Sequence, residues 1–337
     1  MLGKIIRSLA LFLLVVFAVP ALAQTTTDPA ATTDPAATTA AATAGQVEVY
    51  AGAYILRLTN VSPRDGTFDV DMWVWFRWKG NSVNPVETFE LANGIITNRL
   101  PNPQTMDGDF NYATARVQAT VYHQFDVRRF PMDNHVIELE FEDANLTENQ
   151  LIYIADTGTS LDPGVSVAGW DVALLEPSVK SHVYDTDYGM HATGESAAVY
   201  SRFTLPVSLE RTSYGVLFKS FWISLLSVVL GLLAFLVKAD DLDARFGMGV
   251  GSIFAASANS FVISDSLPQT TMVTLAEQIN LIAVGVIFLS VFISIWSLRL
   301  RYKEQEDASL ALDRWAMLIL GVVYVALNVL VMLVDLS

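Results

Sequence analysis

The sequence predicts an all-β sandwich domain followed by a bundle of four membrane-spanning helices. Alternation of apolar and polar residues recurs from residue 46 to residue 211, with turn residues between the runs, which is typical of half-buried strands. Four mostly apolar stretches follow between Tyr214 and Val334, each close to the roughly 20 residues that cross a bilayer. The first half is therefore built to fold in water and the second half in lipid.

The first 45 residues predict an export signal and a linker. Residues 1–23 carry Lys4 and Arg7, then a short apolar run and an Ala-Leu-Ala site, which is typical of a signal peptide cleaved after Ala23. An uncleaved anchor is the alternative, which the short apolar run disfavours. Residues 24–45 repeat TTDPAA and cannot bury a core, so we expect a disordered linker.

Residues 46–211 predict an extracellular ligand-binding domain. In Phe68–Trp78, every second residue is Phe, Val, Met or Trp and forms one apolar face. Turn signals such as Ser62–Gly66 separate the runs. The expected strands lie at Val47–Leu58, Phe68–Trp78, Ala113–Phe125, Val136–Phe141, Trp170–Tyr184 and Val199–Leu209. Many short strands favour a sandwich with one core, and a barrel is the structural alternative.

Residues 212–337 predict the membrane domain, with helices at about 214–237, 246–267, 275–298 and 313–334. The second stretch reads FGMGVGSIFAASANSFVISDSL and is rich in Ser, Gly and Ala, with one Asn. Polar groups at membrane depth normally face protein or water, because lipid cannot satisfy them. We therefore expect the second helix to be shielded from lipid and to line a path.

Charge and composition narrow the partners and the chemistry. The formal net charge is −15 and lies mostly in the sandwich, so nucleic acid is not an expected partner. With no cysteine and four histidines, nucleophilic or zinc catalysis has few candidates, and we predict no enzyme. Basic residues gather in the loops after the first and third helices, namely Lys238, Arg245, Arg299, Arg301, Lys303 and Arg314. Both loops are therefore expected to be cytoplasmic, which places the sandwich outside.

The segment Phe125–Phe141 (FDVRRFPMDNHVIELEF) resembles the signature loop of the pentameric ligand-gated ion channels, the Cys-loop receptor superfamily, in its bacterial form without the disulfide. Gly169-Trp170-Asp171, Arg211 and the closing Leu267-Pro268 match family elements in the right order. The resemblance implies an immunoglobulin-like sandwich, a homopentamer and a multi-pass protein of the bacterial inner (plasma) membrane with its large domain in the periplasm. The first helix lacks the family's usual proline, and the second carries glycines where Ser or Thr is usual.

One face of the second predicted helix, recurring at steps of three and four residues, is the candidate pore lining. It consists of Asp243, Gly247, Gly251, Phe254, Ala258, Phe261 and Asp265, which coincide with the lining positions of the family. Carboxylate rings attract cations and apolar constrictions gate by dewetting, so a cation-selective pore is predicted. Arg245 would neutralise the inner ring if it turned inward. Packing between helices is the alternative role for the two phenylalanines, and close helix contact for the two glycines.

Residues expected to meet at the membrane surface are the candidate coupling site. They are Asp65, Phe130, Pro131, Asp133, Arg211, Leu267 and Pro268. In the family the arginine before the first span pairs with acidic residues, and by position the partners here are Asp133 and Asp65. A surface ion pair of little energetic weight is the alternative.

The candidate ligand site is implied by the family's hairpin between the last two strands. The residues are Trp75, Arg77, Tyr153, Tyr184, Tyr188 and Tyr200. Tyr184, Tyr188 and Tyr200 could form part of an aromatic cage for a cation, with Trp75 or Arg77 offered by the neighbouring copy. Tyrosines that merely cover the sheet are the alternative. Asp185, Asp187 and His191 form a weak metal-like cluster, so modulation by Ca²⁺ or protons is conceivable while no cofactor is expected.

These inferences predict a homopentameric, ligand-gated, cation-selective channel whose partners are the lipid membrane, a small-molecule or ion ligand and inorganic cations. A non-conducting pentameric sensor or binding protein on the same scaffold is the alternative. The sequence disfavours a membrane-anchored enzyme, because it contains no recognisable catalytic triad, HExxH motif or phosphate loop.

Overall fold

A computed structural model describes residues 45–186, 198–212, 214–269 and 272–336 of the chain. The predicted signal peptide and nearly all of the predicted linker lie outside these residues. So do Asp187, Tyr188 and His191 of the candidate ligand and metal sites.

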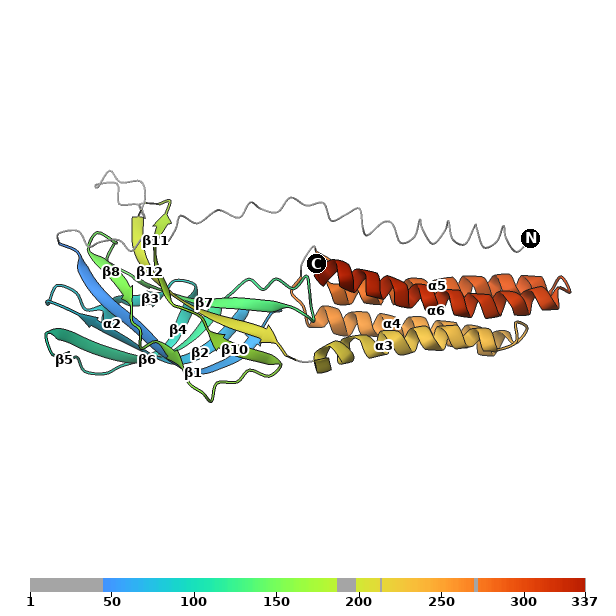
Figure 1. The fold of residues 1–337 in the computed structure, drawn as a ribbon, viewed down its shortest axis with the longest axis horizontal. Coiled ribbons are helices and arrows are strands. Elements are labelled where there is room, and N and C mark those ends of the chain that lie inside the picture. Colours follow the sequence, from blue (N-terminus) through green and yellow to red (C-terminus); the bar gives the residue numbers. More distant parts are fainter. Residues whose placement is uncertain (1–44, 187–197, 213, 270–271, 337) are drawn as a thin grey trace. The chain divides into compact units, whose positions relative to one another are not determined.

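Two sheets form the sandwich (Figure 1). The larger has the order β4-β6-β2-β1-β8, with β5 on β6 and β9 on β1, and the smaller has the order β10-β12-β7-β3, with β11 on β12. The strands are β1 (Val47–Ser62), β2 (Thr67–Trp78), β3 (Phe89–Leu91), β4 (Gly94–Pro101), β5 (Thr105–Asp107), β6 (Phe110–Tyr122), β7 (Asn134–Asp143), β8 (Leu151–Ala155), β9 (Ser160–Leu161), β10 (Trp170–Leu174), β11 (Ser178–Tyr184) and β12 (Ala198–Arg211), and a short helix α2 spans Pro85–Thr88.

The core lies between the two sheets and follows the alternation of the sequence. In β2 the side chains of Phe68, Val74 and Phe76 are fully buried, and those of β7 and β12 meet them from the other layer. Such alternation requires one face of each strand to point at the opposite sheet. The structure is therefore a sandwich, as predicted, and not a barrel.

The stretch predicted as one strand, Trp170–Tyr184, forms two strands in the structure, β10 and β11. They pair with different halves of β12: Trp170 lies opposite Arg211, and Tyr184 lies opposite Ala198. Pro177 lies in the gap and has no N–H to donate to a ladder.

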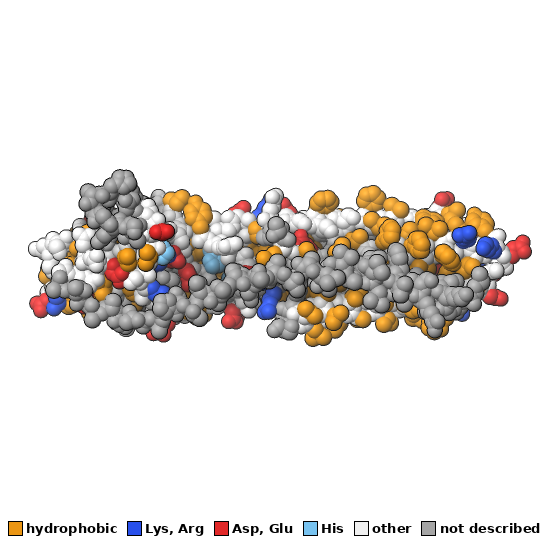
Figure 2. Space-filling model, turned by 90° about the horizontal axis from the view of Figure 1, so that it is seen from above, with side chains coloured by type: hydrophobic (Ala, Val, Ile, Leu, Met, Phe, Trp, Pro, Cys, Tyr) orange, Lys and Arg blue, Asp and Glu red, His pale blue; other side chains and the backbone are white. Residues whose placement is uncertain are grey.

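Four helices follow the sandwich and pack side by side (Figure 1). They are α3 (Tyr214–Leu233, extended by a 3₁₀ turn η1, Ala234–Leu236), α4 (Leu242–Asp265), α5 (Leu275–Arg301) and α6 (Glu306–Leu336). Three are long and apolar enough to cross a membrane, and α3 contributes the shorter described apolar stretch Phe221–Leu236. Hydrophobic side chains gather over this part of the surface (Figure 2). The predicted combination of sandwich and apolar helical bundle is thus confirmed.

Two helices begin earlier than the apolar stretches that predicted them. Helix α4 begins at Leu242, because the Asp241 side chain caps it by accepting from the Ala244 N–H. Helix α6 begins at Glu306, and the carboxylates of Glu306 and Asp307 in its first turn are stabilised by the positive end of the helix dipole. The extra turns place Asp243 and Asp313 within helices.

A buried polar network fixes the rotation of α4 against its neighbours. Ser224 of α3 donates to the Asn280 side chain of α5 at 2.6 Å, and the Asn259 amide of α4 donates to Ser224 at 2.9 Å. All three side chains are buried. Hydrogen-bonding groups within a bilayer must be satisfied inside the protein, so this face of α4 faces α3 and α5 and its opposite face is open.

Candidate pore helix and coupling site

The open face of α4 carries the residues that the helical period predicts. Phe254 and Phe261 are 72% and 77% exposed, and Asp243, Gly247 and Ala258 are also exposed. A methyl group added to Gly247 or Gly251 would meet no atom within 4 Å. Neither phenylalanine is packed within the subunit, so any partner for these rings must come from another copy, from lipid or from a lumen.

Arg245 lies on the opposite face of α4. Its guanidinium is 1% exposed and pairs with Asp313 of α6, with Nη1 at 3.0 Å from a carboxylate oxygen. It also lies over the ring of Phe235, 5.4 Å from the ring centre. Residues two apart on a helix point about 200° away from each other, so Arg245 turns away from Asp243. Within the subunit, Arg245 therefore does not neutralise the Asp243 carboxylate on the open face.

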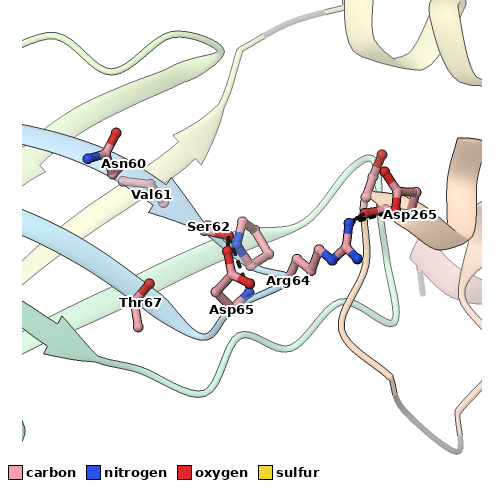
Figure 3. Close-up of a pocket in the computed structure, with 9 residues that line it drawn as sticks. Asn60, Val61, Ser62, Arg64, Asp65, Thr67 and Asp265 are labelled. Atoms are coloured by element: carbon pink, nitrogen blue, oxygen red, sulfur yellow. Dashed lines mark hydrogen bonds and ion pairs between the residues drawn. The ribbon is translucent and has the colours of Figure 1, made fainter.

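The outer end of α4 has a partner that the sequence did not indicate. Figure 3 shows Arg64, in the turn between β1 and β2, reaching Asp265, the last residue of α4. Its Nη1 donates to the Asp265 carboxylate at 2.6 Å and to the Asp265 carbonyl at 2.9 Å. The turn and the helix end line a cavity of about 520 Å³. The Asp265 carboxylate is thus partly compensated, and a strand turn contacts the pore helix directly.

A second ion pair joins the last strand to the signature loop. Arg211, at the end of β12, donates through Nε to Asp133 at 2.8 Å, and His135 Nε2 lies 2.7 Å from the same carboxylate. The Arg211 guanidinium also stacks 4.0 Å from the Trp170 ring. The side chains of Arg211 and Asp133 are 9% and 1% exposed, so the pair is buried and the surface-pair alternative does not describe it.

Burial raises the pKa of the Asp133 carboxyl, but the hydrogen bonds from His135 and Arg211 outweigh it and leave that pKa below its ordinary value. Asp133 therefore stays ionised over the physiological range and keeps its attraction for Arg211. Phe130 of the same loop packs under the guanidinium, with its ring centre 5.3 Å away.

The signature loop also holds the start of α5. The N–H of Leu275 donates to the Arg128 carbonyl at 2.9 Å, and the N–H of Ala276 donates to the Phe130 carbonyl at 3.1 Å. The first N–H groups of a helix have no partner within it, so the loop supplies two of the missing acceptors. Thr274 and Glu277 complete the start with a capping box.

The remaining predicted coupling residues lie near this junction in different roles. Asp65 does not pair with Arg211; it accepts a hydrogen bond from the Ser62 hydroxyl at 2.6 Å, within its own turn. A turn this tight directs the short Asp65 side chain back on itself, and it is the longer Arg64 that reaches the helices. Leu267 is buried and Pro268 is half-buried just after α4, and Pro131 is buried in the signature loop.

The candidate ligand region holds an ion network under the last two strands. Arg202 of β12 donates to Glu142 and Glu140 of β7 and to the Tyr184 hydroxyl of β11. Tyr184 in turn donates to Glu142 at 2.9 Å, and its ring packs edge-on against Tyr200 with centres 5.7 Å apart. Burial and the neighbouring Glu142 raise the pKa of Tyr184 to about 12. The Arg202 guanidinium also lies over the Tyr184 ring, 6.0 Å from its centre.

The other predicted ligand residues are divided between the core and the far sheet. Tyr153 is 2% exposed and packs in the sandwich core against Phe76, so within the subunit it does not present its ring to a ligand. Arg77 of β2 pairs with Asp156 at 2.9 Å and stacks over Tyr50. Trp75, on the same strand, is half-buried. Tyr184 and Tyr200 lie in the smaller sheet and Arg77 lies in the larger one, so a neighbouring copy would be needed to bring them together at one site.

No metal-binding group of three or more His, Asp or Glu side chains occurs among the described residues. Asp185, the one described member of the predicted metal-like cluster, is exposed at the end of β11.

Comparison with known proteins relates the chain to ion channels and receptors at low identity. It is 22% identical to pH-sensitive chloride channel 2 of Anopheles gambiae over 275 residues, covering 73% of this chain and 44% of that protein. It is 23% identical over 188 residues to the human gamma-aminobutyric acid receptor subunit rho-1, and 26% identical over 193 residues to the mouse gamma-3 subunit; each match covers 55% of this chain and 37% of the relative. No family model matches the chain.

The chain spans less than half the length of these curated relatives. These relatives are channels and receptors, which agrees with the resemblance to ligand-gated channels inferred from the signature loop. The chain is related to channels and not to enzymes, as the sequence predicts. The named ion of the first relative is chloride, so the similarity lends no weight to the predicted cation selectivity.

Proposed function

We propose that copies of this chain assemble, as a pentamer, into a ligand-gated ion channel of a bacterial inner membrane with the sandwich on the periplasmic side. The observation that carries this proposal is the open face of α4. Two phenylalanines and two glycines lie unpacked on it, between Asp243 and Asp265 at its two ends, while the polar face is turned into the bundle. A lumen explains carboxylates on this face better than lipid does, since lipid-facing charges are costly.

The proposed pore prefers cations. Asp243 lies exposed at the N-terminal end of α4, and Arg245 is buried away from it. Rings of carboxylates concentrate cations at a pore mouth. The partial compensation of Asp265 by Arg64 leaves Asp243 as the main filter charge.

The ligand acts on the outer domain, and its effect is transmitted to the pore through two ion pairs, Arg64–Asp265 and Arg211–Asp133. We place its site beside the paired ends of β11 and β12, at Tyr184 and Tyr200, completed by the neighbouring copy's β2 with Trp75 and Arg77. The network of Arg202, Glu140 and Glu142 supports a polar or charged small molecule, or protons, over an apolar one.

Current through the reconstituted protein tests the proposal. The purified pentamer would be placed in planar bilayers and recorded in a salt gradient while pH and Ca²⁺ are stepped, with Asp243→Ala beside it. Current whose cation preference falls in Asp243→Ala supports the pore and its filter. A verified pentamer that stays silent under every condition would instead favour the non-conducting sensor, and a chloride preference unchanged by Asp243→Ala would refute the filter.

A further inference from the structure

A buried ion pair joins the pore helix to the outermost helix of the bundle. Arg245 of α4 and Asp313 of α6 have side chains 1% and 6% exposed. Both Nη atoms of the guanidinium donate to the two carboxylate oxygens, so the contact is bidentate. Between two otherwise apolar helices, such a pair persists only because each charge compensates the other.

Asp313 supplies most of what holds Arg245 in place. Among the described residues it is the carboxylate that pairs with Arg245, and the Nε of Arg245 is buried without a hydrogen-bond partner there. The remaining contact is the ring of Phe235, 5.4 Å from the guanidinium carbon. A cation–π contact is worth far less than the cost of a buried, unpaired guanidinium. Without Asp313 the arginine would have to leave this site for water or another carboxylate.

The open face of α4 is one such destination. Asp243 precedes Arg245 by two residues and is exposed at the same end of the helix. The arginine side chain is long and flexible enough to turn toward water around its own helix. Once there it would add a positive charge beside each Asp243 carboxylate and cancel the ring.

We propose that Asp313 determines the ion preference of the pore by holding Arg245 on the protein side of α4. This inference rests on the proposed function. It assigns to α6, a helix outside the pore, a residue that sets the charge inside it. Asp313 is a positioning residue, because it acts through Arg245 and does not line the open face.

The test is the chloride-to-sodium permeability ratio of the reconstituted pentamer. In Asp313→Asn the released arginine should raise this ratio by about fivefold or more, because a ring of paired charges no longer repels anions. In the double variant Arg245→Gln/Asp313→Asn the ratio should return to the wild-type value, since Asp243 again stands alone. Asp307→Asn is the matched control: it removes one exposed carboxylate from the first turn of the same helix and should leave the ratio unchanged.

Three outcomes of this test would overturn the inference. A conducting wild type whose Asp313→Asn variant keeps the wild-type ratio overturns the inference alone. A double variant more cation-selective than the wild type also overturns it, because Arg245 would then already act in the lumen; this arm stands even where Asp313→Asn fails to assemble. A pentamer that passes no current at all overturns the proposed function and this inference with it.

Discussion

The two ends of α4 are held by the same kind of contact in opposite surroundings. At the outer end Arg64 pairs with Asp265, with side chains 54% and 74% exposed. At the inner end Arg245 pairs with Asp313, with side chains 1% and 6% exposed. Exposed pairs contribute little, because water and salt screen them, whereas breaking a buried pair leaves a charge uncompensated. The inner end is therefore an anchor, and the outer end is a contact that can break and form.

The other helices show why this difference concerns α4 in particular. Helix α3 continues from β12 after Arg211, whose side chain is buried against Asp133. The start of α5 is held by two backbone hydrogen bonds to the signature loop. Among the described residues, the side-chain hydrogen bond from the sandwich to α4 is the exposed Arg64–Asp265 pair. This contact can therefore break while the buried network of Ser224, Asn259 and Asn280 still holds α4 to α3 and α5.

Removing one partner at each end of α4 should give the largest contrast. Asp313→Ala should lower the free energy of unfolding by up to about 3–5 kcal/mol, because the buried pair is lost and Arg245 has to leave the packed site that it occupies. Asp265→Ala should lower it by less than about 1 kcal/mol. Denaturant titration of both variants in the same detergent measures the difference. Equal losses at the two ends would remove the distinction between anchor and breakable contact.

Truncating Arg211 tests whether the buried pair at the junction behaves like the inner anchor. Arg211→Ala leaves the Asp133 carboxylate, which is 1% exposed, with His135 as its remaining side-chain partner, so the variant should lose up to about 3–5 kcal/mol of stability along with gating. Arg211→Lys keeps the charge but not the bidentate fork and should be intermediate. The measurement is assembly yield and unfolding free energy beside the response to ligand.

The outer contact should respond to salt, and the inner one should not. Exposed charges are screened over about 8 Å at physiological ionic strength, so high salt weakens Arg64–Asp265 and leaves the buried pair intact. We expect the concentration of ligand giving half-maximal response to shift with salt in the wild type by roughly twofold to fivefold, as a coupling of up to about 1 kcal/mol implies. In Arg64→Gln this shift should be absent. A salt effect of the same size in Arg64→Gln would assign it to another contact.

The periodic features of this comparison could be predicted from sequence. Alternation located the strands of the sandwich, and steps of three and four residues placed Phe254 and Phe261 on one face of α4. Such patterns are local, because they follow from the repeat of the backbone itself. The position of Arg211 before the first helix and its pairing with Asp133 came from a family resemblance and not from a pattern.

The contacts at the ends of α4 could not be predicted in this way. Arg64 and Asp265 are 201 residues apart, and Arg245 and Asp313 are 68 apart. Arg64 was one letter of a turn signal, and Asp313 stood at the polar margin of the fourth apolar stretch. Which distant charges meet is decided by the packing of the bundle and by the docking of the turn, neither of which leaves a period in the sequence.

Acid should lower the stability of the fold by a smaller amount still. Burial and the neighbouring His135 lower the pKa of the His123 ring, and the backbone N–H of this residue donates to the Gly66 carbonyl in the turn that carries Arg64. A lowered histidine pKa means that the folded state prefers the neutral ring, so the stability it protects is present above the ordinary pKa of 6.5 and is lost as pH falls below it. Unfolding free energies measured from pH 7.5 to pH 5 should therefore decline slightly in the wild type and less in His123→Gln. A decline of the same size in His123→Gln would assign the effect of acid to another group.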